Sequence, residues 1–459
     1  MQKAHIQRCG EICNGRPEKG DADMRVLKFG GTSMADAAQY RKVLGIVCSD
    51  PSRRVVVVSA AGKRFPGDTK VTDLLYLCYA HMQYGVGYDD IWQNIVDRYC
   101  AIRDALGLKT DLESEFAALR VRMENGISRD ELVSRGEYFS AILTAEMLGF
   151  PFIDAKRWLT FHYDGTIDQE TSYAALRALV GDGCAVTPGF YGVTPEGAIR
   201  VLTRGGSDIT GALAAAALGA EVYENWTDVC GMLMADPRIV DAPRTIDRAT
   251  YGELRQLSYA GAQVLHEMTI FPVREMNIPL NIRNTNHPEH PGTLVCDDFP
   301  EPPNADRFVT GIAGKKDFSV LTVSKRGMSG AVGTLRAIFS VFERNAVPVS
   351  YVTTGVDCIS LAVPTENLSP CTYTLTDELR KAVHPDDLKI TDNLAIVAVV
   401  GRRMAFRAGT SGKIFDALGK RNINIRMIAQ GPDEMTILVG VENKDYHQTV
   451  RELYEAFVK

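Results

Sequence analysis

The chain has 459 residues, of which 45% are apolar and 24% charged, and its formal net charge is −6. These values are typical of a globular protein with more than one domain, and the mild acidity argues against nucleic acid as the main partner. No apolar run reaches the roughly 18 residues of a transmembrane helix, so we expect no membrane partner. Residues 1–23 lack an apolar signal core, and we expect a flexible extension on a cytoplasmic protein.

The first candidate site is a phosphate-binding turn. Residues 26–29 form a short apolar run that contains Lys28, then Gly30 and Gly31 follow, and a helical pattern covers residues 35–47. A strand that ends at two glycines before a helix brings free backbone N–H groups and the positive end of the helix dipole to one place. Lys28 can add an ammonium there. An ordinary strand–turn–helix connection is the alternative.

A second strand ends close to further polar residues. Residues 54–60 form a continuous apolar run, typical of a strand in a parallel sheet, and Ser59 lies at its end. Open α/β sheets bind their ligands at this end of the strands. After a polar loop at residues 62–70, Thr72 begins a helix. Thr72 can contact a ligand or simply cap the helix.

Glu137 lies within the helical pattern of residues 88–150, next to Gly136. From the residues alone, a charge on a solvated helix face is the simplest interpretation of this glutamate. A glycine inside a helix, however, costs about 1 kcal/mol relative to alanine. Gly136 therefore indicates that another group approaches the helix backbone closely.

A second pair of glycines repeats the first pattern. A strand that starts at residue 199 leads to Arg204, the glycines at residues 205–206 follow, and Asp208 precedes a helix at residues 209–218. Asp208 can serve merely as a helix cap. Two glycine elbows, one with a lysine and one with an arginine and an aspartate, favour a single active site over two unrelated turns.

The rest of the first two thirds alternates between strands and helices. Strand patterns occur at residues 152–155, 184–188, 222–226 and 280–283, and a long helical pattern covers residues 251–273. This alternation predicts an α/β fold with a mainly parallel open sheet flanked by helices.

The last third of the chain contains an internal repeat. Strand–helix–strand patterns occupy residues 318–353 and 394–428. In each, an Arg-Asn pair precedes the last strand, and the two pairs, at residues 344–345 and 421–422, lie 77 positions apart. The repeat predicts two small α+β modules, which can bind a ligand or serve only for dimerisation.

Several motifs resemble those of the aspartate kinases, which are members of the amino acid kinase family. They are Lys-Phe-Gly-Gly-Thr-Ser at residues 28–33, Ser-Arg-Gly-Glu at 134–137, Arg-Gly-Gly-Ser-Asp at 204–208, and Trp-Thr-Asp-Val with Asp-Pro-Arg at 226–229 and 236–238. The C-terminal repeat resembles paired ACT domains. The resemblance implies an amino acid kinase fold followed by two α+β modules of the ACT type, each with βαββαβ order.

The resemblance also implies the domain boundaries. We expect an extension at residues 1–23, a catalytic domain at 24–298 and a regulatory region at 299–459. Within the regulatory region we expect tandem ACT domains at about 306–378 and 392–459.

The implied activity is that of a monofunctional aspartate kinase. This enzyme transfers a phosphoryl group from ATP to the β-carboxylate of L-aspartate, giving 4-phospho-L-aspartate in the first step of lysine, threonine and methionine biosynthesis. A carboxylate with a pKa of about 3.9 is already ionised at neutral pH, so the acceptor needs no general base. The implied cofactor is ATP with Mg²⁺, which the nucleotide and water hold. We expect no metal ligand from the protein, because prolines follow both His287 and His290.

The resemblance assigns roles residue by residue. Lys28 and Asp208 are the expected catalytic residues, and Asp208 orients Lys28. Arg204 is expected to hold the α-carboxylate of aspartate and Glu137 its amino group. The full set expected to bind aspartate is Ser59, Thr72, Glu137, Arg204 and Ser207. The set expected to bind the nucleotide is Lys28, Gly30, Gly31, Thr32, Ser33, Gly205, Gly206, Thr227, Asp228 and Arg238. The set expected to bind an effector is Met328, Ser329, Gly330, Val349, Ser350 and Thr354.

A few positions depart from the family pattern. Gln263 and Leu233 stand where many relatives carry a lysine and a tyrosine near the nucleotide, so we expect nucleotide contacts that differ. Ser350 and Val356 replace acidic residues of lysine-sensitive relatives, which leaves a cationic effector without partners there. Lysine, threonine and other amino acids remain open as effectors.

Two other functions remain open from the sequence. One is a kinase for a different acid, such as glutamate or carbamate, and the other is an amino acid sensor with a degenerate kinase domain. The presence of Lys28, Arg204 and Asp208 argues against degeneration. The ACT-like repeat argues against a different acceptor, and it predicts a homodimer formed through these modules.

Overall fold

The computed structural model describes residues 24–202, 205–262, 270–297, 299, 308–402, 404, 407–430 and 435–458. The chain forms two compact units. The first comprises Met1–Met232, Asp247–Tyr251 and Val264–Phe299. The second comprises Leu233–Ile246, Gly252–Gln263 and Pro300–Lys459. The expected extension at residues 1–23 lies outside the described residues.

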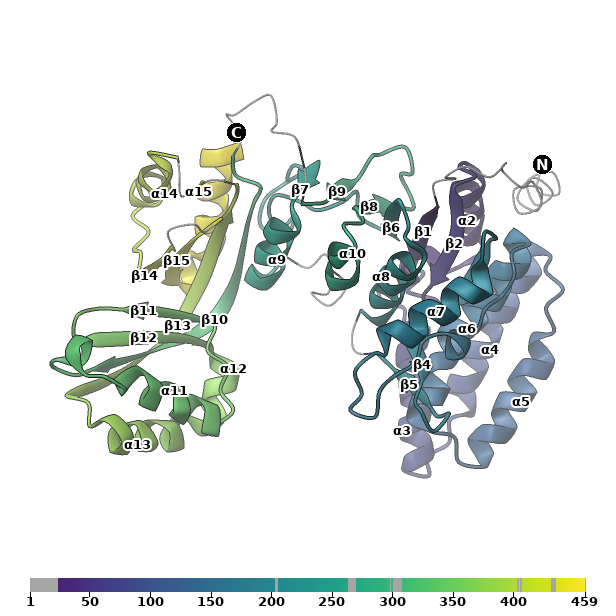
Figure 1. The fold of residues 1–459 in the computed structure, drawn as a ribbon, viewed down its shortest axis with the longest axis horizontal. Helices are drawn as coiled ribbons and strands as arrows, with labels where there is room; N and C mark the ends of the chain where they lie inside the picture. The colour runs from purple at the N-terminus through teal and green to yellow at the C-terminus, as the bar shows by residue number, and fades with distance from the viewer. Residues whose placement is uncertain are drawn as a thin grey trace. The chain divides into compact units, whose positions relative to one another are not determined.

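A seven-stranded sheet forms the centre of the first unit (Figure 1). All strand pairs in it are parallel except the antiparallel pair β8 and β9. The predicted α/β class with a mainly parallel sheet is therefore confirmed. In spatial order the strands are β3 (Ala185–Pro188), β2 (Arg53–Val58), β1 (Arg25–Phe29), β6 (Val222–Thr227), β8 (Leu280–Asn284), β9 (Thr293–Val295) and β7 (Arg248–Ala249).

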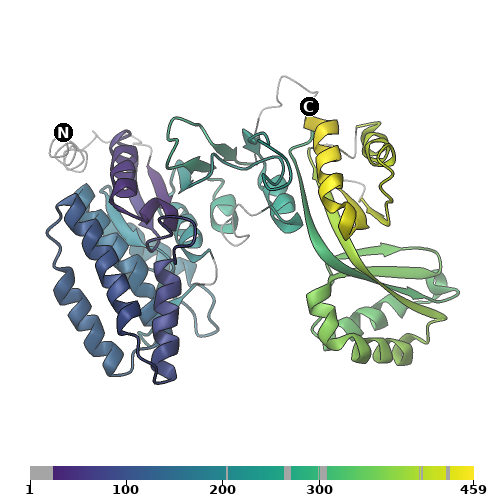
Figure 2. The ribbon, with the colours of Figure 1, turned by 180° about the vertical axis from the view of Figure 1, so that it is seen from behind.

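Helices cover both faces of this sheet. They are α2 (Ala37–Cys48), α3 (Val71–Gln83), α4 (Asp89–Leu106), α5 (Leu112–Glu124), α6 (Arg129–Leu148), α7 (Gln169–Val180), α8 (Gly206–Leu218) and α10 (Ile270–Glu275). Helix α8 packs on β1, β2 and β6, and α7 packs on α8, in the foreground of Figure 1. Helices α2 and α6 contact β2 from the other face, and α2 to α6 lie in the foreground of Figure 2.

The helical pattern of residues 88–150 becomes three helices, because capping residues interrupt it. Gly107 ends α4 in the left-handed conformation, with φ 68°. Asp111 caps α5 by accepting a hydrogen bond from the N–H of Ser114, and Ser128 caps α6 in the same way.

Two predicted strands of the first unit differ in the structure. Residues 152–155 form no strand, since Asp154 caps the short 3-10 turn η2 (Ala155–Arg157). Strand β5 (Ile199–Val201), which leads to the second pair of glycines, is not part of the main sheet. It pairs with β4 (Tyr191–Val193) in a two-stranded hairpin.

The long helix predicted at residues 251–273 is also divided. Helix α9 (Tyr251–Ala260) ends before Gly261, which has φ 121°, and α10 begins at Ile270. Residues 263–269, which include Gln263, lie outside the described residues.

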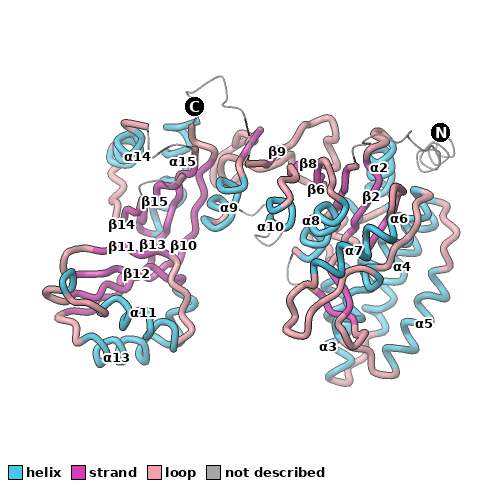
Figure 3. The backbone as a smooth tube through the Cα atoms, viewed as in Figure 1, coloured by secondary structure: helices cyan, strands magenta, loops and turns pink. Residues whose placement is uncertain are grey.

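A six-stranded antiparallel sheet forms the centre of the second unit, as Figure 3 shows in magenta. Its strands, in spatial order, are β11 (Tyr351–Thr354), β12 (Cys358–Pro364), β10 (Gly311–Ser324), β13 (Asp387–Val400), β15 (Thr436–Glu442) and β14 (Met427–Ala429). Its helices are α11 (Thr334–Arg344), α12 (Thr365–Leu368), α13 (Thr372–Val383), α14 (Thr410–Gly419) and α15 (Tyr446–Val458), with 3-10 turns at η4 (Met328–Gly330), η5 (Ser369–Cys371) and η7 (Asn443–Asp445). The predicted α+β modules are present.

The two modules are interleaved rather than arranged in tandem. Strands β10 and β13 each have 14 residues and pair along their length. Leu321 and Val323, late in β10, belong to the core of the first module. Val309, just before β10, and Ile312, near the beginning of β10, belong to the core of the second. The second module therefore begins before the first, which differs from the expected ranges of 306–378 and 392–459.

Part of the segment expected in the catalytic domain folds with the second unit. Ile239 and Val240 are buried in the core of the second module. The guanidinium of Arg451 on α15 donates to the carbonyl of Ile239 at 2.7 Å, and the Tyr454 hydroxyl accepts from the N–H of Arg244. These contacts explain why the structure does not divide at residue 298.

Candidate active site

One cavity of about 400 Å³ collects most of the predicted site residues. It lies in the first unit, where β1, β2 and β6 end and where α3 and α8 begin, as expected for an open α/β sheet. The predicted residues that line it are Lys28, Gly30, Gly31, Thr32, Ser59, Thr72, Glu137, Gly205, Gly206, Ser207, Asp208, Thr227 and Asp228.

The turn after β1 has the close backbone packing that its glycines allow. The N–H of Gly62 donates to the carbonyl of Gly31 at 2.7 Å. A Cβ atom on Gly62 would lie 2.3 Å from the carbonyl carbon of Gly31, so only glycine fits. The N–H of Gly30 donates to Trp226 and is not directed at a ligand. Among the described residues the N–H of Gly31 has no partner, so it is the glycine donor that can bind a phosphate.

Lys28 and Asp208 form the ion pair that the sequence predicts. The Lys28 ammonium lies 2.5 Å from Oδ1 of Asp208, and the lysine side chain is almost fully buried. Asp208 lies in the first turn of α8, and Gly205 caps this helix in the left-handed conformation with φ 79°. The two glycine elbows therefore meet in one site.

Asn225 is a polar residue of this site that the sequence analysis missed. Its amide donates to Oδ1 of Asp208 at 2.9 Å, and its neighbour in register on β1 is Lys28. The Tyr223 hydroxyl donates to the backbone carbonyl of Asp208 at 3.0 Å. A buried asparagine in a strand is the signal that could have identified this residue, because a buried amide requires hydrogen-bond partners.

Phe190 is a second residue that the sequence analysis did not assign. It lines the cavity and has a positive φ of 78°, which is unusual for an aromatic residue. A Cβ atom on the preceding Gly189 would lie 2.8 Å from Cα of Ser207, so the backbone just after β3 lies directly against the beginning of α8. Backbone strain of this kind is concentrated at functional sites.

Glu137 is buried in the cavity wall, and its Oε2 has no hydrogen-bond partner among the described residues. Burial raises the pKa of this carboxyl to about 8, because the charged form is desolvated. The close approach predicted at Gly136 is confirmed: a Cβ atom there would lie 2.7 Å from Cβ of Ala60. An unpartnered carboxylate oxygen beside a cavity can accept a cationic group such as an amino group.

Thr72 is not the cap of α3. Lys70 occupies the N-cap position of that helix. Thr72 is the second residue of the helix and lines the cavity. The capping alternative for Thr72 is therefore wrong.

Two predicted residues, Ser33 and Arg238, are not among the described residues that line the cavity. Ser33 is buried, and its hydroxyl lies 2.8 Å from that of Thr285. Arg238 belongs to the second unit, where its guanidinium pairs with Asp236. Arg204 lies outside the described residues, although the next residue, Gly205, lines the cavity. Roles for these three residues stay predictions.

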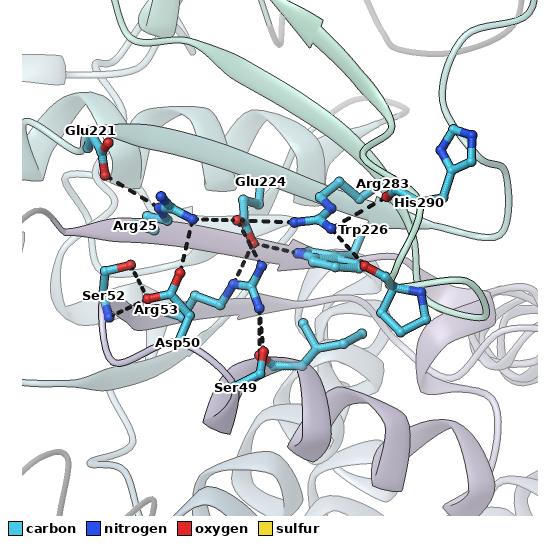
Figure 4. A network of polar contacts seen from close by, with 12 residues as sticks. Arg25, Ser49, Asp50, Ser52, Arg53, Glu221, Glu224, Trp226, Arg283 and His290 are labelled. Atoms are coloured by element: carbon cyan, nitrogen blue, oxygen red, sulfur yellow. Dashed lines mark hydrogen bonds and ion pairs between the residues drawn. The ribbon is translucent and has the colours of Figure 1, made fainter. Parts of the chain in front are cut away.

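A network of charged side chains ties together the strands that carry the site (Figure 4). Glu224 on β6 is buried and accepts two hydrogen bonds from Arg53, at 2.9 and 3.1 Å. Arg25 on β1 and Arg283 on β8 approach the same carboxylate, and the Trp226 indole donates to it at 2.9 Å. Four neighbouring strands are therefore joined through one carboxylate.

The residues expected to bind an effector lie in the first α+β module. Met328, in η4, is buried in its core. The N–H of Ser329 donates to Val356, whose side chain is exposed, and the N–H of Ser350 donates to Ala362. The remaining members of the predicted set are Gly330, Val349 and Thr354. Effector binding by this set stays a prediction.

Comparison with known proteins decides the family. The amino acid kinase family model matches residues 23–284, more than half of the chain, and an ACT domain model matches residues 397–457. Aspartokinase 3 of Bacillus subtilis (strain 168) is 33% identical over 450 residues, covering 95% of this chain and 98% of that protein. The chain belongs to the aspartokinases of the amino acid kinase family.

Solved structures agree with this membership. The aspartate kinase of Clostridium acetobutylicum has 43% sequence identity and a TM-score of 0.85, over 95% of this chain and 100% of that one. Aspartokinase III of E. coli is 28% identical over 95% of this chain and 100% of that one. Its structure with aspartate and ADP gives a TM-score of 0.76, and its structure with lysine and aspartate gives 0.71.

Proposed function

We propose that the chain transfers the γ-phosphoryl group of ATP to the β-carboxylate of L-aspartate, giving 4-phospho-L-aspartate. The observation that carries this proposal is one cavity that joins the Lys28–Asp208 ion pair to Glu137, whose Oε2 has no hydrogen-bond partner among the described residues. A cation for a phosphate and an anion for an amino group thus face one space. The aspartokinase relatives support the same reaction.

Lys28 stabilises the phosphoryl group during transfer. Its ammonium lies in a desolvated wall, where a charge interacts more strongly with a partner than it does in water. Asp208 and Asn225 hold the lysine side chain in position, and the N–H of Gly31 adds a backbone donor. Transfer between two anions needs alignment and charge neutralisation rather than a base.

Glu137 binds the amino group of aspartate. The ionised carboxylate gains a charge-assisted hydrogen bond when the substrate ammonium enters, and this gain offsets its desolvation. Ser59, Thr72 and Ser207 line the same cavity and supply hydroxyl groups for the substrate carboxylates. Arg204, by its sequence motif, holds the α-carboxylate.

The nucleotide occupies the part of the cavity that Gly31, Thr227 and Asp228 line. The described residues contain no group of three or more His, Cys, Asp or Glu side chains that could hold a metal by themselves. The carboxylates of Asp208 and Asp228 in the lining fit a Mg²⁺ ion that is carried mainly by the phosphates and water. When bound, Mg²⁺ neutralises phosphate charge.

The test is a substrate panel with the purified full chain. ADP release is measured with L-aspartate, L-glutamate and carbamate, and the acyl phosphate is trapped as a hydroxamate. The proposal requires ADP release that depends on aspartate and an equal amount of aspartyl hydroxamate. Equal or faster turnover with glutamate, or ADP release without hydroxamate, would contradict it.

We further propose that the chain works in the cytoplasm, as a homodimer that an amino acid regulates through its ACT modules. None of the described helices combines the length and hydropathy needed to cross a bilayer. Edge strands β11 and β14 leave unpaired backbone groups, and Val332 and Val356 are exposed apolar side chains in the first module. Sedimentation velocity tests dimerisation, and the kinase assay with added lysine, threonine or methionine tests regulation.

A further inference from the structure

The polar loop predicted at residues 62–70 contributes Gly62 and Lys70 to the lining of the cavity. Residues 62–70, here called the strap, connect the end of β2 to α3. The two ends of the strap are tied, since the N–H of Val71 donates to the carbonyl of Ala61 at 3.0 Å. Gly62 packs directly on Gly31, as described above. The strap is therefore a closed surface loop that is anchored on the phosphate-binding turn.

Arg98, on α4, holds the strap in this closed form. Its guanidinium donates to the carbonyls of Gly62 and Thr69, the latter at 2.7 Å, and pairs with Asp68 at 3.0 Å. The side chain of Arg98 is only 1% exposed, although its Nε has no partner among the described residues. Burying a guanidinium is costly unless its donors are used. Here the terminal nitrogens of Arg98 donate hydrogen bonds to groups of the strap.

A second arginine strengthens the closure from within the strap. Arg64 forms two hydrogen bonds to the carboxylate of Asp68, at 2.9 and 3.1 Å, and its backbone N–H donates to the same group. The hydrogen bonds from Arg64 hold the pKa of Asp68 far below its usual range. The lowered pKa favours the ionised Asp68 carboxylate, which is the form that pairs with Arg98.

Lys70, the last residue of the strap, lies at the cavity. Lys70 is the N-cap residue of α3, and it lines the cavity together with Ser59 and Thr72. Within the described lining the cations are Lys28 and Lys70, and Lys28 is already paired with Asp208. Lys70 makes no ion pair with any described residue.

The charges of the substrate indicate what Lys70 meets. Aspartate carries one ammonium and two carboxylates, and the proposed function gives the ammonium to Glu137 and the α-carboxylate to Arg204. The side-chain carboxylate must still approach an anionic phosphoryl group, and a cation beside it reduces that repulsion. Lys70 lines the cavity together with Ser59 and Thr72, whose hydroxyl groups the proposed function assigns to the substrate carboxylates.

We propose that Lys70 binds the side-chain carboxylate of the amino acid, and that Arg98 is a positioning residue that holds the strap so that Lys70 faces the cavity. The inference rests on the proposed function, because it takes aspartate as the substrate. It adds a contact with the acceptor group itself, which distinguishes the acidic amino acid from its amide.

The first experiment measures binding of aspartate and of asparagine to the full chain by calorimetry, with Mg-ADP present. Asparagine lacks the side-chain carboxylate. In Lys70→Met the Kd for aspartate should rise by about tenfold or more, while the Kd for asparagine should change by less than about twofold. Lys63→Met is the matched control, since Lys63 is an exposed lysine of the same strap that does not line the cavity. It should leave both constants unchanged.

The same titrations can also contradict the inference. An unchanged aspartate Kd in Lys70→Met, an equal loss for aspartate and asparagine, or the same loss in Lys63→Met would each contradict it. Wild-type turnover with aspartate separates this failure from that of the proposed function. If the wild type phosphorylates aspartate and Lys70→Met binds it equally well, only the inference fails.

A double-mutant cycle tests the role of Arg98. Arg98→Met should raise the aspartate Kd by about the same factor as Lys70→Met, and the double variant should be no weaker than either single variant. Trypsin should also cleave at Lys63 and Arg64 faster in Arg98→Met than in the wild type. If the two substitutions multiplied their effects on the aspartate Kd, or if trypsin cleaved Arg98→Met no faster than the wild type, Arg98 would not act through the strap. If Arg98→Met does not fold, Asp68→Asn breaks the same ion pair without a change in volume.

Discussion

The side-chain amide of Asn225 and the ammonium of Lys28 share one acceptor atom, Oδ1 of Asp208. Asn225 donates to Oδ1 of Asp208 at 2.9 Å, and the ammonium of Lys28 lies 2.5 Å from the same atom. Lys28 and Asn225 are neighbours in register on two parallel strands, and Asp208 comes from the first turn of α8. Three elements far apart in the sequence therefore determine the position of the lysine that meets the phosphoryl group.

Replacing Asn225 by leucine should lower kcat while the fold is retained. The amide fixes the rotamer of Asp208, and a hydrogen bond to a charged group contributes about 1.5–3 kcal/mol, or roughly ten- to a hundredfold in rate. Steady-state kinetics with aspartate and ATP measure this effect, and thermal unfolding checks the fold. A kcat within about twofold of the wild type would show that Asp208 needs no support from β6.

Glu137→Gln should change the pH dependence of stability. Burial raises the pKa of Glu137 to about 8, so the folded chain keeps a proton that the unfolded chain releases at lower pH. The stability that this neutral carboxyl contributes is fully present below the unfolded pKa and is lost as the pH rises through the folded value. The melting temperature of Glu137→Gln minus that of the wild type should therefore increase between about pH 5 and about pH 9. A difference that does not change with pH would exclude a raised pKa.

The same residue should make aspartate binding depend on pH. The substrate ammonium pairs with the ionised carboxylate, so the KM for aspartate in the wild type should rise as the pH falls below about 8, where burial has placed the pKa of Glu137. Glu137→Gln should have a high KM without this dependence, and its KM for ATP should change little. If the KM for ATP rose instead, Glu137 would belong to the nucleotide part of the cavity.

Glu224→Ala should unfold more easily than any surface variant of the same network. It removes the carboxylate that Arg53, Arg25 and Arg283 share in the interior of the sheet. Removing one partner of a buried ion pair costs about 3–5 kcal/mol. Glu221→Ala is the control, because Glu221 pairs with Arg25 at the surface and should contribute less than about 1 kcal/mol. Urea unfolding measures both, and equal losses would refute a special role of Glu224.

The sequence predicted the site residues that lie within contiguous motifs. Lys28 and Gly31 were proposed because a strand that ends at glycines before a helix can bind a phosphate, and the family resemblance added Asp208. Gly136 was predicted to mark a close approach, and the structure places Ala60 against it. The inferences about the glycines and Lys28 depend on local geometry, which the motifs contain.

The residues that were missed depend on packing between distant segments. Asn225 matters because β6 lies beside β1 in one particular register, and Lys70 because Arg98 closes the strap from another helix. The hydroxyl of Ser33 lies 2.8 Å from that of Thr285. A motif does not state which face of a turn is buried, so this contact could not be predicted from the sequence, and a role of Ser33 at the nucleotide stays a prediction.

The interleaved ACT modules have a similar explanation. The repeat of 77 positions revealed two modules, but the pattern is local and does not show which strands complete each sheet. Gly311 pairs with Val400 and Ser324 pairs with Asp387, so two long strands cross both modules. Long-range antiparallel pairing of this kind has no signature in either repeat alone.

The turnover of Lys28→Met with aspartate and Mg-ATP tests the proposed role of the lysine directly. In the proposed reaction this buried ammonium, held by Asp208, stabilises the phosphoryl group during transfer. We predict that kcat falls by about a thousandfold or more, with little change in the melting temperature and with aspartate still bound. A kcat within about tenfold of the wild type would contradict the claim, because the phosphoryl group would then be stabilised elsewhere.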